Sequence, residues 1–286
     1  MSLRPADCYA IRHLVTVCGD YARQQAQIGF QVFEKGVDDY VTTVDRALDA
    51  KLLAGLQTLF PEDGIITEEN RATVRQIQVS QRRLWFVDPI DGTDDFIHGR
   101  PNYAVMVGYL LDGQPQAGWI HAPAHGKIYW GSREQGLFWQ QGYDSPQPLT
   151  PVHPPLISGQ RWNLVIGDQD RRRYGADLVR HLPGMSFVSL GSFGLKVLQV
   201  ITGQAGLYIY LNGRVKLWDT VGPLALAHAA GLVCCDLDGN PLRFSEPHVD
   251  PDTVTHRQPI LVGWPPYMAQ FRPVIQRVVA TAPALI

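Results

Sequence analysis

Hydrophobic side chains recur at the period of an α-helix near the start of the chain. Between residues 6 and 28 one apolar stripe contains Ile11, Leu14, Val15, Cys18 and Ala22. A second stripe begins after Asp45 and stops near residue 59, before Pro61. The pattern therefore predicts two amphipathic helices, joined through a polar turn at residues 35–39.

Short apolar runs replace this helical spacing from Gly64 onward. They predict strands over residues 64–67, 84–87, 103–111, 116–121, 127–130 and 136–139. Asp112 and Gly113 form a hairpin signal between two of these runs, so we expect an antiparallel meander. Residues 144–155 contain five prolines and little periodicity, and we interpret them as a connection between two halves of the chain.

Strand-like and helix-like segments alternate in the rest of the chain. The pattern predicts strands over residues 164–167, 186–190, 206–211 and 260–263, and helices after Asp170 and over residues 195–202 and 219–230. Such alternation is typical of an α/β fold. We therefore predict an N-terminal α+β half over residues 1–150 and a C-terminal α/β half over residues 151–286.

Composition restricts the kind of ligand. The formal net charge of −2 provides no broad basic field for nucleic acid or anionic lipid, which favours a small-molecule ligand. We interpret the basic run at residues 171–173 as a solvated helix face. The N-terminal residues lack the apolar stretch of a secretory signal, and the four cysteines lack metal-binding spacing. We expect a cytoplasmic protein with free thiols and without a nucleic-acid or membrane partner.

The strongest chemical signal is the segment W-F-V-D-P-I-D-G-T at residues 85–93. A strand that ends in acidic residues projects them where α/β sheets bind ligands. Pro89 restricts the backbone so that Asp88 and Asp91 can converge, and Gly92 lets the main chain approach an anion closely. Two close carboxylates repel each other, and Mg2+ prefers the oxygen ligands that they supply. A plain polar turn, with Asp91 or Thr93 capping a helix, is the alternative interpretation.

Four segments resemble motifs of the inositol monophosphatase superfamily, in the same order along the chain. They are D-Y-V-T-T-V-D at 39–45, I-T-E-E-N at 66–70, W-F-V-D-P-I-D-G-T at 85–93 and L-W-D-T at 217–220. The resemblance covers roughly residues 36–235. It implies a metal-dependent, lithium-sensitive phosphatase with a layered αβαβα fold of the inositol monophosphatase or fructose-1,6-bisphosphatase type. It also implies a homodimer.

The resemblance assigns the metal ligands by position. They are Glu68, Asp88, Asp91, Asp219 and the main-chain carbonyl of Ile90. This set implies two or three Mg2+ ions, with Mn2+ as an alternative ion, which activate a water for direct attack and stabilise the leaving oxygen. Considered singly, Glu68 would be a solvated acid and Asp219 a helix N-cap, so only the joint pattern favours a metal site.

The same resemblance assigns the residues that handle the water and the phosphate. Glu68, Thr93 and Asp45 are the expected catalytic residues, the last two by orienting the attacking water. The main-chain amides of Gly92 and Thr93 are expected to bind phosphate at the start of a helical turn. Asp94 and Asp95 follow directly, and we interpret them as capping residues, with a further metal ion or repulsion of wrong substrates as the alternatives.

Residues outside the ligand set favour a substrate with a second phosphate. Ser192, Lys196, Asn212 and Arg214 are expected to bind substrate, and Lys216 adds positive charge, although each cation alone would be a solvated surface residue. Residues 191–203 resemble the bisphosphate nucleotidase branch, and Asn212 replaces a glutamate that inositol-specific enzymes carry.

We therefore predict hydrolysis of 3'-phosphoadenosine 5'-phosphate or a sugar bisphosphate. Inositol 1-phosphate is the alternative substrate. An inactive metal-binding regulatory protein is a remote alternative, because Asp45, Glu68 and Thr93 are all present.

Overall fold

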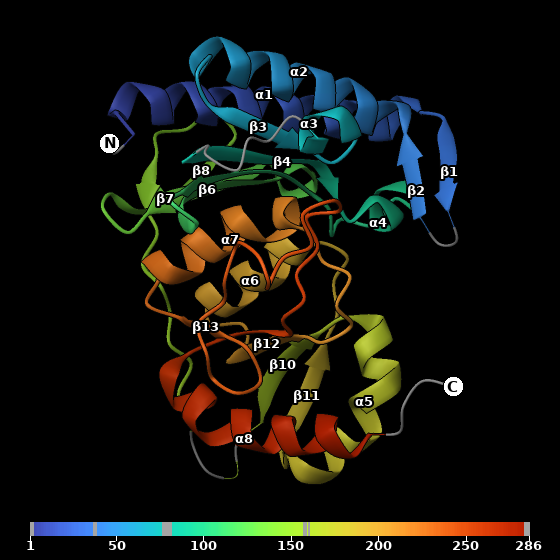
Figure 1. Cartoon of the computed structure of the whole chain (residues 1–286), viewed down its shortest axis with the longest axis vertical. Coiled ribbons are helices and arrows are strands. Elements are labelled where there is room, and N and C mark those ends of the chain that lie inside the picture. The colour runs from blue at the N-terminus through green and yellow to red at the C-terminus, as the bar shows by residue number, and fades with distance from the viewer. Residues whose placement is uncertain (1–2, 37–38, 76–81, 157–158, 160, 283–286) are drawn as a thin grey trace.

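Layers of helices and sheets alternate through the molecule. The computed structural model describes residues 3–36, 39–75, 82–156, 159 and 161–282. Figure 1 shows α1 (Pro5–Ile28) and α2 (Thr43–Leu59) above one sheet, α6 (Phe193–Ile201) and α7 (Leu217–Ala229) below it, then a second sheet with α5 (Asp168–His181) and α8 (Pro265–Thr281). The predicted layered αβαβα sandwich is confirmed.

The two N-terminal helices follow the predicted apolar stripes. In α1, Ile11, Val15 and Cys18 are buried, and Pro5 occupies the first turn, where no helical donor is lost. In α2, Thr42 caps the helix, and its amide donates a 2.8 Å hydrogen bond to the Asp45 carboxylate. The capping box therefore fixes where α2 begins and places Asp45 at its buried end.

The first sheet contains most of the predicted strands. In spatial order its strands are β3 (Gly64–Thr67), β4 (Arg83–Asp91), β5 (Ala104–Leu111), β6 (Gln114–Ala122), β7 (Lys127–Ser132), β8 (Gly136–Gln141) and β9 (Gln147–Pro148). The strands from β4 to β9 pair antiparallel, which confirms the meander, whereas β3 pairs parallel to β4. β9 lies in the proline-rich segment, where no strand was predicted.

The second sheet is mixed. In spatial order its strands are β11 (Met185–Val188), β10 (Trp162–Ile166), β12 (Leu207–Tyr210), β14 (Ile260–Gly263) and β13 (Val233–Cys235). β14 pairs antiparallel with both neighbours, while β10 pairs parallel with β11 and β12. The predicted alternation of strands and helices is confirmed, including the strand predicted over residues 260–263, which is β14, and β13 and α8 are additional elements.

A hairpin occupies the region where a polar turn was expected. β1 (Val32–Gly36) and β2 (Asp39–Thr42) pair antiparallel on either side of residues 37–38, which lie outside the described residues. Short helices α3 (Arg71–Arg75), α4 (Thr93–Ile97) and a 3-10 turn, η1 (Pro123–His125), complete the elements described. Of these, α4 confirms the helical turn expected after Gly92.

The C-terminal helices pack directly on the N-terminal sheet. A Cβ added to Gly108 of β5 would lie 2.3 Å from the Gly222 nitrogen of α7, and one added to Gly118 of β6 would lie 2.2 Å from the Gly222 oxygen. Backbone contact this close requires glycine on both sides. The two halves therefore share a hydrophobic core, and the boundary near residue 150 remains a prediction.

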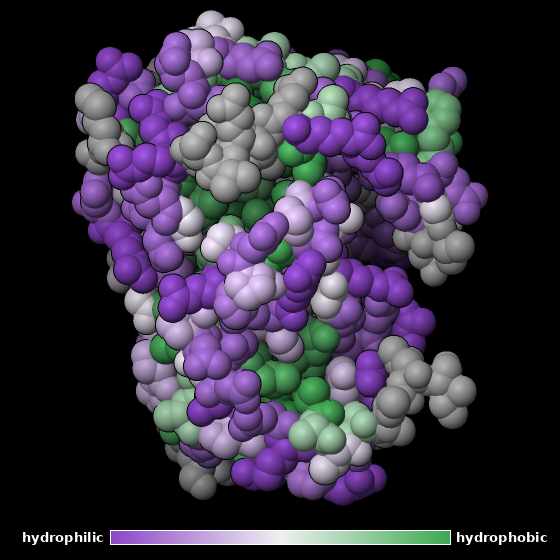
Figure 2. Space-filling model, viewed as in Figure 1, coloured by the Kyte–Doolittle hydropathy of each residue, from purple (hydrophilic) through white to green (hydrophobic). Residues whose placement is uncertain are grey.

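The surface view shows a hollow between the upper and lower layers, on the side of the β1–β2 hairpin and α5, lined mainly by hydrophilic residues (Figure 2).

Within the described residues, none of the helices combines the length and apolar character that a membrane crossing needs.

Candidate active site

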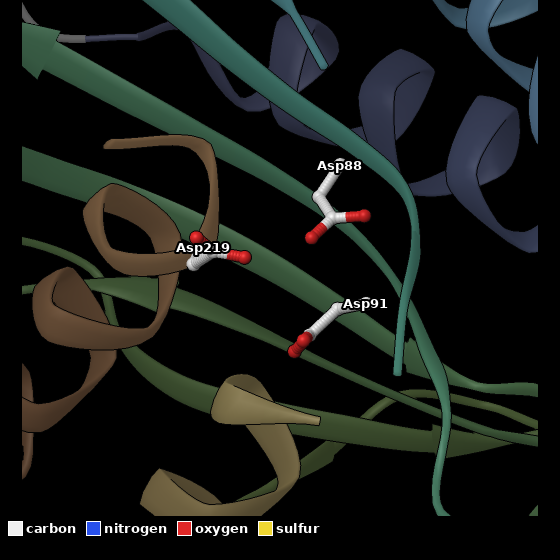
Figure 3. A group of neighbouring side chains, drawn as sticks. All are labelled: Asp88, Asp91 and Asp219. Carbon is white, nitrogen blue, oxygen red and sulfur yellow. The ribbon is translucent and has the colours of Figure 1, made fainter. Parts of the chain in front are cut away.

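Three aspartates from two parts of the chain converge between the sheets. Asp88 and Asp91 lie at the end of β4, and Asp219 lies in the first turn of α7. Each supplies a carboxylate oxygen within 4.8 Å of the others, and Figure 3 shows the three carboxylates around one space. The structure thus brings together three of the residues predicted as metal ligands.

A bulge in β4 makes this convergence possible. Residues separated by three positions on a regular strand point to opposite faces. Here the step from Asp88 to Asp91 pairs with the shorter step from Met106 to Ala104 on β5, so β4 contains an extra residue. The bulge at Pro89 and Ile90 turns both carboxylates to the same side.

The three carboxylates lack a close ion-pair partner, although the charge of Lys196 acts on Asp91 and that of Lys216 acts on Asp219 from further away. Among the described residues, no lysine or arginine forms an ion pair with any of them. Asp88 is only 1% exposed, and its Oδ1 has no hydrogen-bond partner. Burial, followed by repulsion from Glu68 and Asp91, raises the pKa of Asp88 well above its ordinary value. Burial likewise raises the pKa of Asp219 to about 7.

These properties fit a hard divalent cation. Oxygen ligands in an anionic, buried site suit Mg2+, and an unpartnered buried carboxylate oxygen is costly without such an ion. Two of the aspartates are held from the side: Lys216 N donates to Asp219 Oδ2 at 2.7 Å, and Ser192 Oγ donates to Asp91 Oδ2 at 2.5 Å. The residues present therefore fit the metal that the resemblance implies.

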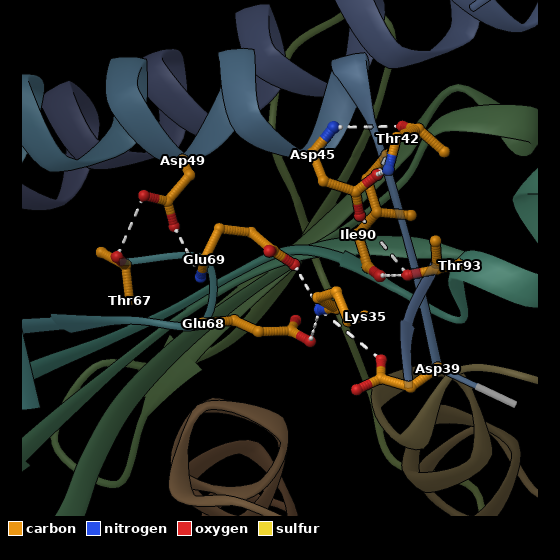
Figure 4. Close-up of polar contacts among 10 residues, drawn as sticks. All are labelled: Lys35, Asp39, Thr42, Asp45, Asp49, Thr67, Glu68, Glu69, Ile90 and Thr93. Atoms are coloured by element: carbon orange, nitrogen blue, oxygen red, sulfur yellow. Dashed lines mark hydrogen bonds and ion pairs between the residues drawn. The ribbon is translucent and has the colours of Figure 1, made fainter. Parts of the chain in front are cut away.

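Glu68 belongs to a second acidic cluster, formed with Glu69, Asp39 and Lys35 (Figure 4). Lys35 Nζ lies 3.4 Å from Glu68 Oε1, 2.8 Å from Glu69 Oε1 and 3.7 Å from Asp39 Oδ1. Burial raises the pKa of Glu68 to about 8, although Lys35 opposes the shift. Glu68 therefore lies beside the three aspartates, but its carboxylate is paired with a lysine.

Asp49 supports this second cluster and was not identified from the sequence. Its buried carboxylate accepts hydrogen bonds from Thr67 Oγ1 at 3.0 Å and from Glu69 N at 3.3 Å. An aspartate next to the buried stripe of α2, one residue after Leu48, is the signal that could have identified it. Asp49 thus fixes the turn that carries Glu68.

Thr93, Asp45 and the carbonyl of Ile90, which the sequence assigned to the site, lie together (Figure 4). Thr93 Oγ1 lies 3.0 Å from the Ile90 oxygen and 3.4 Å from Asp45 Oδ1. Thr42 Oγ1 donates to Asp45 Oδ2 at 2.5 Å. Burial raises the pKa of Asp45 to about 6. The threonine hydroxyl therefore has two acceptors beside the carboxylate cluster.

Gly92 is required by both its conformation and its surroundings. Its φ of 91° lies in the left-handed region, and a Cβ would lie 2.9 Å from the Asn102 oxygen and 3.0 Å from Ser192 N.

Asp94 and Asp95, interpreted as capping residues, instead form ion pairs with Arg100. Asp95 Oδ2 also accepts a 2.9 Å hydrogen bond from Gly191 N, which links α4 to the loop before α6.

The predicted substrate residues do not form one cationic wall. Lys196 is 6% exposed, its Nζ donates to the Gly191 oxygen at 3.0 Å, and burial lowers its pKa. Lys216 is half-buried and donates to Thr255 Oγ1 at 2.5 Å. Arg214 is exposed, and its amide donates to Asn212 Oδ1 at 3.1 Å. Only Arg214 of these cations presents its charge openly to solvent.

Known proteins resemble this chain over most of its length. The model of the inositol monophosphatase family matches residues 6–270. The 3'(2'),5'-bisphosphate nucleotidase CysQ of Escherichia coli strain K12 is 31% identical over 216 residues, which are 75% of this chain and 83% of CysQ. A histidinol-phosphatase of Chlorobaculum parvum is 40% identical over 222 residues, which are 73% of this chain and 77% of that protein.

A solved structure has the same fold. It is an IMPase/NADP phosphatase complexed with Mg2+ and phosphate, with a TM-score of 0.72 and 21% identity, and the match covers 92% of this chain and 90% of that one. The family match, the relatives and the fold agree with the motifs and with the acidic site. The chain therefore belongs to the inositol monophosphatase family, whose members are metal-dependent phosphatases.

Proposed function

We propose that this chain hydrolyses a small, soluble phosphate monoester at the site formed by Asp88, Asp91 and Asp219, with Mg2+ as its cofactor. The observation that carries the proposal is the set of three carboxylates within 4.8 Å of one another, of which Asp88 has an oxygen without a hydrogen-bond partner. Glu68 and the carbonyl of Ile90 complete the proposed ligand set. Bound Mg2+, or Mn2+ in its place, would supply Lewis-acid stabilisation of the phosphoryl oxygens and a water of lowered pKa.

The chain's own residues would orient the reactants. Thr93 Oγ1 lies between the Ile90 oxygen and Asp45 Oδ1, so its hydroxyl and the Asp45 carboxylate can hold the attacking water in line. The left-handed turn at Gly92 leaves the amides of Gly92 and Thr93 as donors for the phosphate oxygens. No phosphoenzyme is expected, because the motif set has no serine, cysteine or histidine nucleophile.

A substrate with a second phosphate is the favoured class, such as 3'-phosphoadenosine 5'-phosphate or a sugar bisphosphate. The likeness to CysQ supports this choice, and the exposed Arg214 supplies a cation for a second anion. Inositol 1-phosphate is the alternative, and Asn212 would then have to contact the ring hydroxyls without a charge. The homodimer and lithium sensitivity expected from the resemblance remain predictions.

A substrate panel tests both levels of the proposal. Phosphate release from 3'-phosphoadenosine 5'-phosphate, fructose 1,6-bisphosphate, inositol 1-phosphate and histidinol phosphate would be measured with Mg2+, with Mn2+, with EDTA, and with Mg2+ plus lithium. We expect Mg2+-dependent release and the highest kcat/KM for a bisphosphate, reduced several-fold in Arg214→Ala. If inositol 1-phosphate is best and Arg214→Ala leaves the ranking unchanged, the bisphosphate assignment is wrong. If none is hydrolysed, the regulatory alternative is favoured.

A further inference from the structure

The first turn of α6 already holds one oxygen of Asp91. Asp91 Oδ2 accepts hydrogen bonds from Ser192 Oγ at 2.5 Å and from Gly194 N at 2.9 Å. Both of these hydrogen bonds end on Oδ2, and neither reaches Oδ1 of the same carboxylate. The two oxygens therefore differ, because one is used within the protein and the other is left for a ligand.

The orientation of the Ser192 hydroxyl is determined by its neighbours. Its oxygen accepts a 3.0 Å hydrogen bond from Leu195 N, so its proton is free to point to Asp91. The side chain is completely buried, with 0% exposure. The Ser192 hydroxyl can donate to a substrate only if it first gives up its bond to Asp91.

The backbone that carries Ser192 is fixed from both halves of the molecule. Gly191 N donates to Asp95 Oδ2 at 2.9 Å, and the Gly191 oxygen accepts from Lys196 Nζ at 3.0 Å. Ser192 N donates to the Asn102 oxygen at 3.0 Å. These bonds connect the α4 region of the first half to α6 of the second half at the point where Asp91 is held.

We infer that Ser192 is a positioning residue for the metal site, which holds Asp91 Oδ2 so that Oδ1 alone is presented to the cation. The inference rests on the metal site of the proposed function. It differs from the substrate-binding role expected for Ser192, because a positioning residue acts on metal affinity in the absence of substrate. Hydrogen bonds that orient metal ligands are worth about 10- to 100-fold in metal affinity.

Calorimetric titration of the full chain with MgCl2, without substrate, tests the inference. We expect Ser192→Ala to raise the Kd for Mg2+ by about tenfold or more and Ser192→Thr, which keeps the hydroxyl, to restore most of the affinity. Ser189→Ala is the matched control. It removes a serine–aspartate hydrogen bond of 2.7 Å, to Asp168, on the exposed side of the same loop, and should leave Mg2+ binding unchanged.

The outcomes separate this inference from the proposed function. If the unsubstituted chain binds no Mg2+, the proposed function fails. If it binds Mg2+ and Ser192→Ala binds equally well, the inference is overturned, whether the variant raises KM or only lowers Tm. Should Ser192→Ala unfold, Ser192→Cys keeps the size and weakens the donor, and an unchanged Kd in that variant would likewise overturn the inference.

Discussion

Two acidic clusters lie next to each other in this molecule, and they are balanced in different ways. Around Glu68, Glu69 and Asp39, the chain supplies its own cation, because Lys35 Nζ lies within 3.7 Å of all three carboxylates. The cluster of Asp88, Asp91 and Asp219 has no such partner among the described residues. The cluster of Asp88, Asp91 and Asp219 is therefore the one for which we propose an ion from solution.

The position of each cluster in the fold explains the difference. Lys35 comes from the exposed strand β1, and its long side chain can reach acidic residues at the edge of the site while remaining 25% exposed. The three aspartates lie where β4 meets α7, and the buried Lys196, whose charge acts on Asp91, donates to the Gly191 oxygen rather than to a carboxylate. A partly exposed lysine in the Glu68 cluster can be displaced, so we interpret Lys35 as a competitor of metal for Glu68.

The largest expected effect comes from removing one charge from the cluster of Asp88, Asp91 and Asp219. Asp88→Asn should lower Mg2+-dependent phosphate release by about 10³-fold, because several kcal/mol of electrostatic stabilisation depend on the ion. The metal-free variant should melt higher than the unsubstituted protein, because the substitution relieves repulsion among buried carboxylates. Asp177→Asn, which removes an exposed carboxylate paired with Arg180, is the control. Near-normal turnover of Asp88→Asn with Mg2+ would contradict the proposed site.

The pH dependence of stability should distinguish metal-free from metal-loaded protein. The pKa values of Asp45, Asp219 and Glu68 are raised to about 6, 7 and 8, so the folded state binds more protons than the unfolded state above about pH 4. The free energy of unfolding therefore decreases as pH rises from 5 to 8, and this decrease should lower the Tm of the metal-free protein by about 5 °C.

Saturating Mg2+ should cancel this decline, because the ion binds the ionised carboxylates and binds more tightly as pH rises. Differential scanning fluorimetry across the pH range, with Mg2+ or with EDTA, measures both curves. A metal-free Tm that climbs steadily from pH 5 to pH 8 would show that these carboxylates are not destabilised by folding.

Removing the Lys35 charge should leave the carboxylates of both clusters without an ion-pair partner. Lys35→Met should destabilise the metal-free protein by about 1 kcal/mol, a small value because the lysine is partly exposed and screened by solvent. The same variant should bind Mg2+ a few times more tightly, since Glu68 no longer has a competing partner. Urea unfolding and calorimetry measure the two effects, with Lys51→Met on the exposed face of α2 as control. Weaker Mg2+ binding would show that Lys35 supports the metal site.

The smallest effect is expected for a substitution of Asp49, which supports the cluster that contains Glu68 and Lys35. Asp49→Asn keeps one carbonyl oxygen but loses one of the hydrogen bonds from Thr67 and Glu69. The loss of about 0.5–1 kcal/mol should lower kcat/KM about two- to fivefold. Steady-state kinetics at saturating Mg2+ would check this value. An effect as large as that of Asp88→Asn would mean that Asp49 itself contacts an ion or the substrate.

Helix α8 and hairpin β1–β2 show where pattern reading fails. Pro265, Pro266 and Pro273 interrupt the usual signals of a helix, but the first two lie in its first turn, where a missing donor costs nothing. No residue of β1 is buried, so the alternation of buried and exposed positions that indicates a strand is absent. These elements form because neighbouring parts of the fold pack against them or pair with them.

Local pattern determined much of this protein. The resemblance of the motifs to a known family implied that Asp88, Asp91 and Asp219 share one site, whereas the apolar stripes themselves set α1 and α2. The reason is that helix periodicity, capping and the turn at Pro89 depend on residues close together in the chain.

Only the tertiary structure decided which charges are neutralised. It paired Lys35 with Glu68, buried Lys196 against the Gly191 oxygen, and turned the Ser192 hydroxyl to Asp91. A sequence does not show these contacts, because the charge state and reach of a side chain depend on the segments packed around it, and those segments are far apart along the chain.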